Sequence, residues 1–354
     1  MFTKEDTNKI KGIAVLMLIF HHLYLVDDDI SYLAERSFSF SVIDLPVTAV
    51  CFRICVYIFC FLSAYGTSAG LKDRKCDLKY YVYRSWRLLS PYWFTLIVLN
   101  LVYMVVYRSF FYSNPLFLLF DMIPILEILG LPYSMFCPVL WYMNFTIIMI
   151  VALPLIYKLT EKIGGLVIVV TFLVFRFLPA GIVSPFGGPY IMYLFAVEFG
   201  VLFQTNDLFG KIKTIHGKLP LVSKVLDFIG LILYSFFCPY IAEVYVSNSN
   251  LGLKSFLITT GAISLIAFGY LYLTPRIAAK PLEVIGRYSY DMYFVHIMVM
   301  YVLDVVPHIS DNNIILYITN VLGSFLAAYT LYLLKKYSGW FKLIDKVSKK
   351  IQLS

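Results

Sequence analysis

Long apolar runs separated by short clusters of lysine and arginine are the feature that most constrains the fold of this chain. Hydrophobic residues make up 60% of the 354 residues, and charged residues only 14%, whereas a soluble globular domain carries about 25% charged residues. A helix needs about 20 apolar residues to cross the hydrocarbon core of a bilayer, and apolar runs approaching or exceeding that length recur along the sequence. The sequence therefore predicts an all-α, polytopic transmembrane helix bundle.

Ten apolar runs predict membrane-spanning helices. They cover residues 10–26, 46–70, 91–111, 138–157, 164–179, 189–205, 225–242, 255–273, 289–306 and 313–334. The run 115–131 is also apolar, but prolines interrupt it, so we expect a re-entrant or interfacial segment on the outer side. Because no long polar stretch divides the runs, we expect residues 1–354 to form one integral-membrane domain. We also expect the first helix to be retained, since no signal-peptide cleavage site follows it.

The lysines and arginines predict the orientation of the bundle. Most of the 29 Lys and Arg residues lie at the two termini or in the loops after the second, fourth, sixth and eighth spans. Membrane proteins concentrate these residues on the cytoplasmic side, so both termini are predicted to be cytoplasmic. The net charge of +8 is then a topology signal, and no nucleic-acid partner is predicted. From Lys335 onward, Trp340 and Phe341 stand among lysines, which suits a helix lying on anionic membrane lipids.

The six cysteines show no spacing typical of metal or disulfide chemistry. Three share one apolar run and three are isolated, namely Cys51, Cys55, Cys60, Cys76, Cys137 and Cys238. We expect them to be free thiols or small apolar packing residues. No metal site is predicted.

The first apolar run, KGIAVLMLIFHH, connects a lysine to a pair of histidines. On a helix, Lys11 and His22 lie on nearly the same face, about 16 Å apart. That distance is about half the hydrocarbon thickness, so His22 is predicted near the middle of the bilayer. Ionisable groups at this depth usually face a bundle interior or a wet cavity, which favours a functional role. In the alternative interpretation, His21 or His22 only bonds a neighbouring carbonyl.

Three arginines extend the candidate site. Arg84 and Arg87 are three residues apart and share a helix face, and paired guanidinium groups match phosphate oxygens. They are candidates for binding a nucleotide or coenzyme phosphate, or else ordinary topogenic charge beside lipid headgroups. Arg53 lies inside the second span, where an arginine needs a partner or water. It either pairs with an acid such as Asp44 or lines an acceptor pocket.

The ninth predicted span carries further polar groups. His296 shares a face with two tyrosines placed at three-residue spacing. It is either a second polar group in the cavity of His22 or a satisfied core histidine. Asp291 is interpreted as an acid at the start of a helix. Glu198, in the sixth span, has no assigned role.

The order and spacing of these motifs resemble the acyltransferase 3 family, integral-membrane enzymes that O-acylate extracytoplasmic sugars. The family's first helix carries Lys or Arg, ten residues, and then His, which matches Lys11 and His22. FCFLSAYG at 59–66 is similar to the family's second-helix motif, and Arg53 matches the upstream arginine of the sugar O-acetylase-like subgroup.

The resemblance continues to the end of the chain. The family's Arg-x-x-Arg motif falls on Arg84 and Arg87, its tryptophan-led fourth helix on LWYM with Trp141, and its Gly-Arg-x-Ser-Tyr motif with a later histidine on 286–296. There are departures: Ala64 replaces a glycine, Tyr57 stands where a proline is common, and Asn144 follows the tryptophan where some relatives carry a glutamate. The missing glutamate leaves the catalytic acid unassigned.

The resemblance implies a membrane O-acyltransferase. Such an enzyme would move an acyl group, expected to be acetyl, from cytoplasmic acetyl-CoA to a hydroxyl of an envelope glycan or its lipid-linked precursor, in the plasma membrane of a bacterium. The resemblance implies that His22 and Lys11 are catalytic. It implies that Arg84 and Arg87 bind the coenzyme. Substrate binding is implied for Arg53, Trp141 and His296.

Two other functions compete with this one. Similar membrane domains are found fused to amino-acid racemases, where substrate uptake is implied, so the chain could be a transporter of a small polar substrate in which His22 relays protons. The other alternative is an assembly or anchoring subunit with no chemistry. The burial of Lys11, His22 and Arg53 argues against a passive scaffold, because intramembrane charge is costly.

Overall fold

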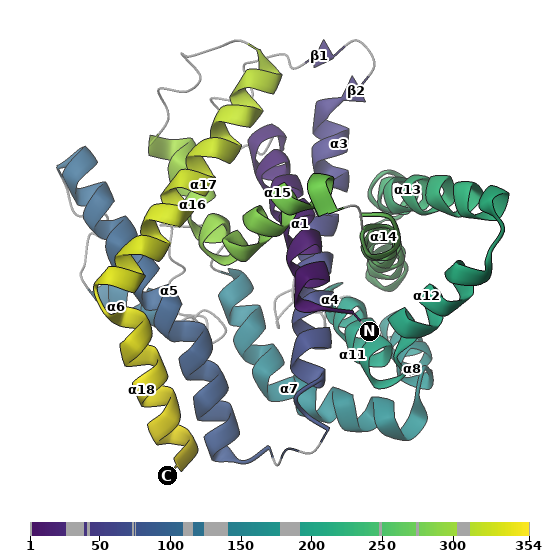
Figure 1. Cartoon of the computed structure of the whole chain (residues 1–354), viewed down its shortest axis with the longest axis horizontal. Helices are drawn as coiled ribbons and strands as arrows, with labels where there is room; N and C mark the ends of the chain where they lie inside the picture. Colours follow the sequence, from purple (N-terminus) through teal and green to yellow (C-terminus); the bar gives the residue numbers. More distant parts are fainter. Residues whose placement is uncertain are drawn as a thin grey trace. The chain divides into compact units, whose positions relative to one another are not determined.

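The computed structural model confirms an all-α architecture (Figure 1). It describes residues 2–25, 39–40, 43–72, 74, 76–108, 116–123, 141–177, 192–247, 250–273, 276–302 and 312–353. Within these ranges, extended backbone pairs only between β1 (Ser39–Phe40) and β2 (Ile43–Asp44), which form an antiparallel ladder of two residues each.

Most of the described helices lie in the predicted apolar runs, whereas two helices, Leu208–Lys218 and Arg276–Arg287, lie between those runs and were not predicted. The helices are α1 (Lys4–Tyr24), α3 (Leu45–Cys51), α4 (Ile54–Ser68), α5 (Leu78–Tyr107), α6 (Leu116–Met122), α7 (Trp141–Ile163), α8 (Leu166–Phe177), α11 (Leu194–Thr205), α12 (Leu208–Lys218), α13 (Leu221–Val244), α14 (Leu251–Tyr272), α15 (Arg276–Arg287), α16 (Ser289–Val302), α17 (Asn313–Tyr337) and α18 (Trp340–Leu353). Each predicted span contains one or two of them. The predicted re-entrant segment contains α6, and its residues 124–131 lie outside the described ranges.

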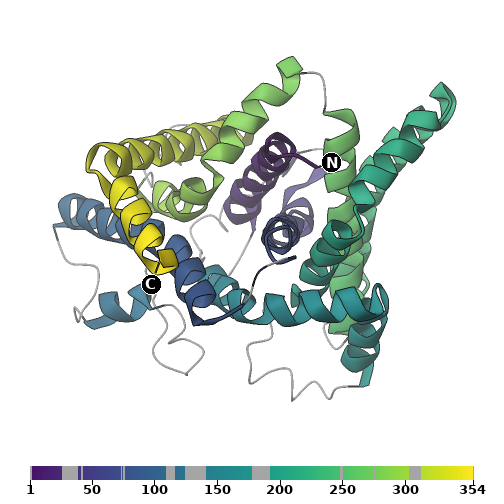
Figure 2. The ribbon, with the colours of Figure 1, turned by 60° about the horizontal axis from the view of Figure 1, so that its bottom comes forward.

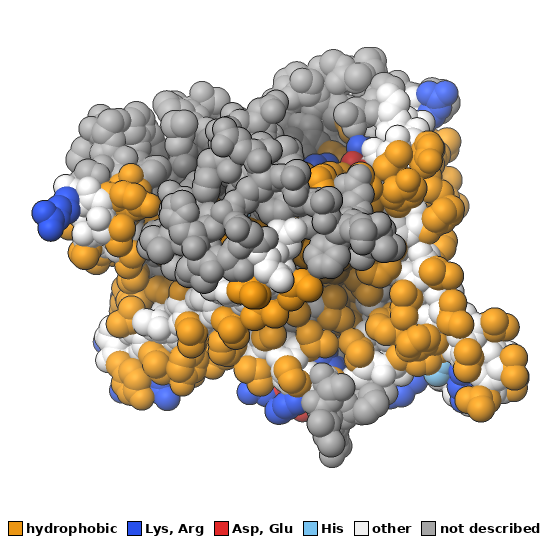
Figure 3. Space-filling model, turned by 90° about the horizontal axis from the view of Figure 1, so that it is seen from above, with side chains coloured by type: hydrophobic (Ala, Val, Ile, Leu, Met, Phe, Trp, Pro, Cys, Tyr) orange, Lys and Arg blue, Asp and Glu red, His pale blue; other side chains and the backbone are white. Residues whose placement is uncertain are grey.

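Six helices in the described ranges are long and apolar enough to cross a membrane. They are the span Pro46–Ser68, which contains α3 and α4, and the helices α5, α7, α13, α14 and α17, while α8 and α11 are shorter apolar helices. Large apolar side chains stay exposed along them, including Val105 on α5 at 76% and Leu326 on α17 at 61%. Hydrophobic side chains also dominate the described surface in Figure 3. An exposed apolar surface of this extent suits a bilayer. Ten spans and cytoplasmic termini stay predictions.

One boundary differs clearly from the sequence prediction. The third span was expected to start at 91, but α5 begins at Leu78 because the side chain of Asp77 caps it by accepting a hydrogen bond from the Tyr80 amide, 3.0 Å away. A helix of 30 residues is about 45 Å long, which exceeds the hydrocarbon core of about 30 Å. The arginine pair therefore lies on the helix itself and not in the loop before it.

The chain forms two compact units, residues 1–72 with 156–289 and residues 73–155 with 290–354. In the first unit, α1 packs against α15 at backbone contact. A Cβ added at Gly12 would overlap the carbonyl oxygen of Leu282, and one at Gly286 would overlap that of Asn8. Small residues allow such close helix approach in membranes. Hydrogen bonds from Arg287 and Lys280 lower the pKa of Glu283 on the same helix. The close approach of α1 and α15 at Gly12 and Gly286 fixes the position of α1 within its unit.

In the second unit, α18 lies beside α5 (Figure 2). The indole nitrogen of Trp340 donates to the carbonyl of Ser90 at 3.0 Å, and that of Trp86 donates to the carbonyl of Ile344 at 3.2 Å. The predicted tail helix is therefore present, and it is attached to the helix that carries the arginine pair. Its contact with lipid stays a prediction.

Candidate functional site

The first helix holds Lys11 and His22 as the sequence predicts. α1 is uninterrupted from Lys4 to Tyr24, and Thr3 and Asp6 form a reciprocal capping box at its start. An unbroken helix keeps Lys11 and His22 within about 20° of the same face. Both side chains are half-buried.

The two neighbouring histidines differ in their surroundings. His21 is 6% exposed, and its Nδ1 lies 2.5 Å from the carbonyl oxygen of Ala49 on α3. The two imidazole rings meet edge to face, with centroids 5.0 Å apart. The interpretation of a histidine that bonds a neighbouring carbonyl therefore holds for His21. His22 keeps part of its surface open and is the better candidate for chemistry.

Arg53 lies at the junction of α3 and α4. Its amide donates to the carbonyl of Val50 at 3.1 Å, in a tight turn between the two helices. The guanidinium lies 3.4 Å from a carboxylate oxygen of Glu243 on α13, and its side chain is 33% exposed. The sequence analysis considers Asp44 as the ion-pair partner, and the structure places Glu243 in that role. The Asp44 side chain lies outside the described part of the structure.

Glu243 is shared between two cations. Its other carboxylate oxygen lies 2.7 Å from the ammonium of Lys254 on α14, and both of these side chains are under 10% exposed. Arg53, Glu243 and Lys254 thus form a cluster whose three charges sum to +1. We missed Glu243 and Lys254, although a signal was present: they are the only charged residues between 228 and 275. Opposite charges at the facing ends of two successive apolar runs predict an ion pair.

Replacing Glu243 with glutamine is expected to destabilise the protein by about 3–5 kcal/mol, because it leaves the buried Lys254 ammonium without its carboxylate. Thermal unfolding of the detergent-solubilised protein would measure the effect. Glu161→Gln is the matched control. Glu161 is exposed, and glutamine can still accept the hydrogen bond that the Tyr157 hydroxyl donates to it, so stability should change by no more than about 0.5 kcal/mol. Equal stability of the two variants would contradict a buried ion pair.

The arginine pair lies near the start of α5 in the second unit. Because the helix is continuous through both residues, Arg84 and Arg87 share a face as predicted. The Arg87 guanidinium lies 2.8 Å from a carboxylate oxygen of Asp345 on α18, and the two side chains are 47% and 66% exposed. An exposed ion pair is worth only about 0–1 kcal/mol, so a phosphate group can compete with Asp345 for Arg87.

Trp141 and His296 also lie in the second unit. Trp141 begins α7 and is half-buried, with its ring 5.9 Å from that of Tyr142. Tyr142 in turn contacts Tyr293 on α16, at 5.3 Å between ring centroids. His296 is fully buried, with its Nδ1 3.3 Å from the carbonyl oxygen of Met292 on its own helix. This contact suits the interpretation of a core histidine, and its role in substrate binding stays a prediction.

Asp291 and Lys335 form an ion pair that we did not predict. The Lys335 ammonium lies 2.5 Å from Asp291 and is 1% exposed, and Thr95 on α5 donates to the same carboxylate oxygen at 3.3 Å. The sequence predicts Lys335 among the cytoplasmic cations of the tail. It is buried instead because α17 extends to Tyr337 and turns Lys335 onto its packed face. Asp291 is thus a packing partner of α17 and α5, not only a helix-start acid.

The candidate residues divide between the two units. The first unit holds His22, Lys11 and Arg53, and the second holds Arg84, Arg87, Trp141 and His296. A shared passage from the arginine pair to His22 therefore stays a prediction. The five cysteines in the described ranges form no disulfide with one another. Those ranges contain no cluster of three or more His, Cys, Asp or Glu side chains that could hold a metal ion.

The fold and these polar groups define a polytopic helical membrane protein with buried ionisable side chains. Comparison with protein families gives the more particular assignment. The acyltransferase domain of the acyltransferase 3 family matches residues 8–333, nearly the whole chain, and the chain belongs to this family. Membership indicates an acyltransferase. Neither the curated proteins nor the solved structures gave a match.

Proposed function

We propose that this protein is an O-acetyltransferase that moves an acetyl group from cytoplasmic acetyl-CoA to a hydroxyl of an envelope glycan or its lipid-linked precursor. The observation that carries the proposal is the half-buried His22 on α1, within a family of acyltransferases. An imidazole titrates close to neutral pH, which makes it an effective general base.

In the proposed reaction, His22 accepts the proton of the acceptor hydroxyl while the hydroxyl oxygen attacks the thioester carbonyl carbon. The new C–O bond forms, the C–S bond breaks, and the coenzyme thiolate leaves and takes up a proton. The alternative, in which His22 itself carries the acyl group between donor and acceptor, uses the same residue as nucleophile. Lys11 either neutralises donor phosphate or closes the inner end of the passage.

Arg53 is proposed to orient the acceptor or to stabilise the tetrahedral oxyanion. Two observations support this role. Its side chain is the most exposed of the Arg53–Glu243–Lys254 cluster, and Glu243 has its closer contact with Lys254, at 2.7 Å against 3.4 Å for Arg53. Arg53 therefore keeps much of its charge available to a developing anion. Arg84 and Arg87 are proposed to bind the donor phosphates, with Trp141 and His296 in the acceptor site.

The proposal is tested with purified protein in lipid vesicles, given acetyl-CoA labelled in its acetyl group together with envelope glycan. We expect label in the glycan fraction, released by mild base as an ester is, with one free coenzyme A formed per label transferred. Movement of a small polar substrate across the vesicle membrane without coenzyme release would instead favour the transporter.

A further inference from the structure

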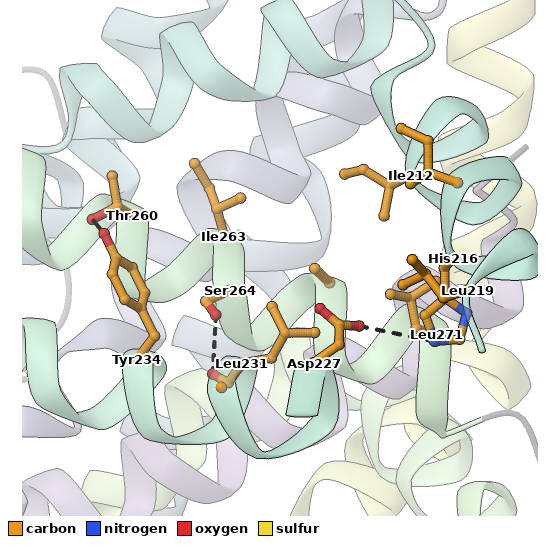
Figure 4. A pocket seen from close by; sticks show the side chains of 13 residues that line it. Ile212, His216, Leu219, Asp227, Leu231, Tyr234, Thr260, Ile263, Ser264 and Leu271 are labelled. Atoms are coloured by element: carbon orange, nitrogen blue, oxygen red, sulfur yellow. Dashed lines mark hydrogen bonds and ion pairs between the residues drawn. The ribbon is translucent and has the colours of Figure 1, made fainter. Parts of the chain in front are cut away.

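A cavity of about 530 Å³ lies between α12, α13 and α14 in the first unit (Figure 4). Its wall is mainly aliphatic. Ile212 comes from α12, Leu219 directly follows that helix, Leu231 comes from α13 and Ile263 comes from α14. The volume is within the range of about 300–1,000 Å³ that is typical of small-molecule sites. None of the residues proposed for acyl transfer lines it.

The polar side chains around the cavity already form hydrogen bonds within the protein. Ser264 donates to the carbonyl of Leu231 at 2.9 Å, and Tyr234 donates to the hydroxyl of Thr260 at 3.3 Å. At the α12 end, the Tyr272 hydroxyl lies 2.8 Å from Asp227 and 2.9 Å from Nε2 of His216. A polar occupant would need hydrogen bonds that these groups already use. The wall therefore favours an aliphatic chain over a sugar or a nucleotide.

The helix at one end of the cavity is basic and amphipathic. The cavity is lined by the apolar residues Ile212 and Ile215 of this helix and by Leu219, which follows it. The lysines Lys211, Lys213 and Lys218 are exposed. Lys211 and Lys218 are seven residues apart, so they lie within about 20° of one another on the helix. A helix of this kind lies at the membrane interface and attracts anionic headgroups. No acidic residue occurs from 208 to 226.

The neighbouring surface of α13 faces outward with large apolar side chains. Leu233 is 63% exposed and Tyr234, which lines the cavity, is 45% exposed. Along α13, Asp227 and Tyr234 are about 10 Å apart, which is shorter than the roughly 15 Å depth of one leaflet. An acyl chain can therefore lie against this wall while its headgroup stays at the level of α12.

We propose that this cavity binds the acyl chain of an anionic phospholipid whose headgroup contacts Lys211 and Lys218. The site is separate from the residues proposed for acyl transfer, and its ligand is a resident membrane lipid, not a substrate. The lipid fills a surface that α12, α13 and α14 leave open and holds α12 against the bilayer.

Native mass spectrometry of the full chain, in detergent with equal amounts of phosphatidylglycerol and phosphatidylcholine, tests the proposal. The key variant is Gly230→Phe, because Gly230 lines the cavity and a Cβ there meets nothing within 4 Å. Gly217→Phe is the matched control, since Gly217 is equally open but does not line the cavity. Wild type and Gly217→Phe should retain one phosphatidylglycerol. Gly230→Phe should bind it at least about tenfold more weakly, as exclusion of a few methylene groups is sufficient for that change.

A second pair of variants tests the headgroup. Lys211→Gln/Lys218→Gln should lose the preference for phosphatidylglycerol over phosphatidylcholine, by about fivefold per lysine. Lys158→Gln/Lys162→Gln, which removes two exposed lysines of α7, should keep it. Equal lipid retention by Gly230→Phe and Gly217→Phe would overturn the proposal, and displacement of the lipid by acyl-CoA would assign the cavity to the donor instead. If Gly230→Phe does not fold, Gly230→Leu supplies a smaller filling side chain.

Discussion

Replacing His22 with alanine is expected to reduce acetyl transfer by about 10²–10⁴-fold, the usual contribution of general acid–base catalysis. A loss beyond that range would favour a covalent role, because removing a nucleophile abolishes a chemical step. Stability should change little, because His22 is only half-buried. Initial rates of glycan labelling and thermal unfolding, measured on the same reconstituted preparations, give the two readouts.

The neighbouring histidine is the control. His21→Ala removes a buried hydrogen-bonding group that contacts the Ala49 carbonyl, so it should lower the free energy of unfolding by about 1–3 kcal/mol. His21→Gln, which can still donate at this position, should recover much of that loss and much of the activity. If His22→Ala retained wild-type acetylation while His21→Ala did not, His22 would have no catalytic role and the chemistry would have to be assigned elsewhere.

The sequence predicts the apolar helices of this protein, because a bilayer requires long apolar runs and such runs are visible in the sequence. It does not predict α12 and α15, whose mixed polar and apolar residues form no such run. It also predicts which residues share a helix face, because this prediction needs only the helical period. Examples are Lys11 with His22 and Arg84 with Arg87. The predicted start of α5 is 13 residues too late, since the first three turns of that helix carry Lys79, Arg84 and Arg87, and the cap at Asp77 is a local signal that hydropathy ignores.

The helical period could not predict which residues form ion pairs with one another. Arg53 and Glu243 are 190 residues apart, and Lys335 and Asp291 are 44 apart. A helical pattern identifies the face on which a charged residue lies, but several helices can cover that face. The need for a partner was clear for Arg53, because an intramembrane arginine is costly alone. It was not clear for Lys335, which follows an apolar run and resembles any other cation at a helix end.

Replacing both arginines of α5, as Arg84→Gln/Arg87→Gln, is expected to weaken coenzyme A binding by about 30- to 100-fold. Each guanidinium–phosphate contact at a partly exposed surface contributes about 1.5 kcal/mol, or about tenfold, and the two adjacent side chains will not contribute independently. Calorimetric titration of the purified protein with coenzyme A measures the change. Lys349→Gln/Lys350→Gln removes the same charge from the exposed surface of α18 and should change binding little.

A variant at Asp345 distinguishes coenzyme binding by Arg87 from a purely structural role of Arg87. Because Asp345 pairs with Arg87 across exposed side chains, Asp345→Asn should release the guanidinium and tighten coenzyme A binding by the value of a surface ion pair, up to about fivefold. If Arg87 instead serves only to attach α18 to α5, Asp345→Asn will lower stability and leave the affinity unchanged. Unchanged affinity in both the double arginine variant and Asp345→Asn would reduce the arginine pair to a topology and packing signal. The donor phosphates would then have to bind elsewhere.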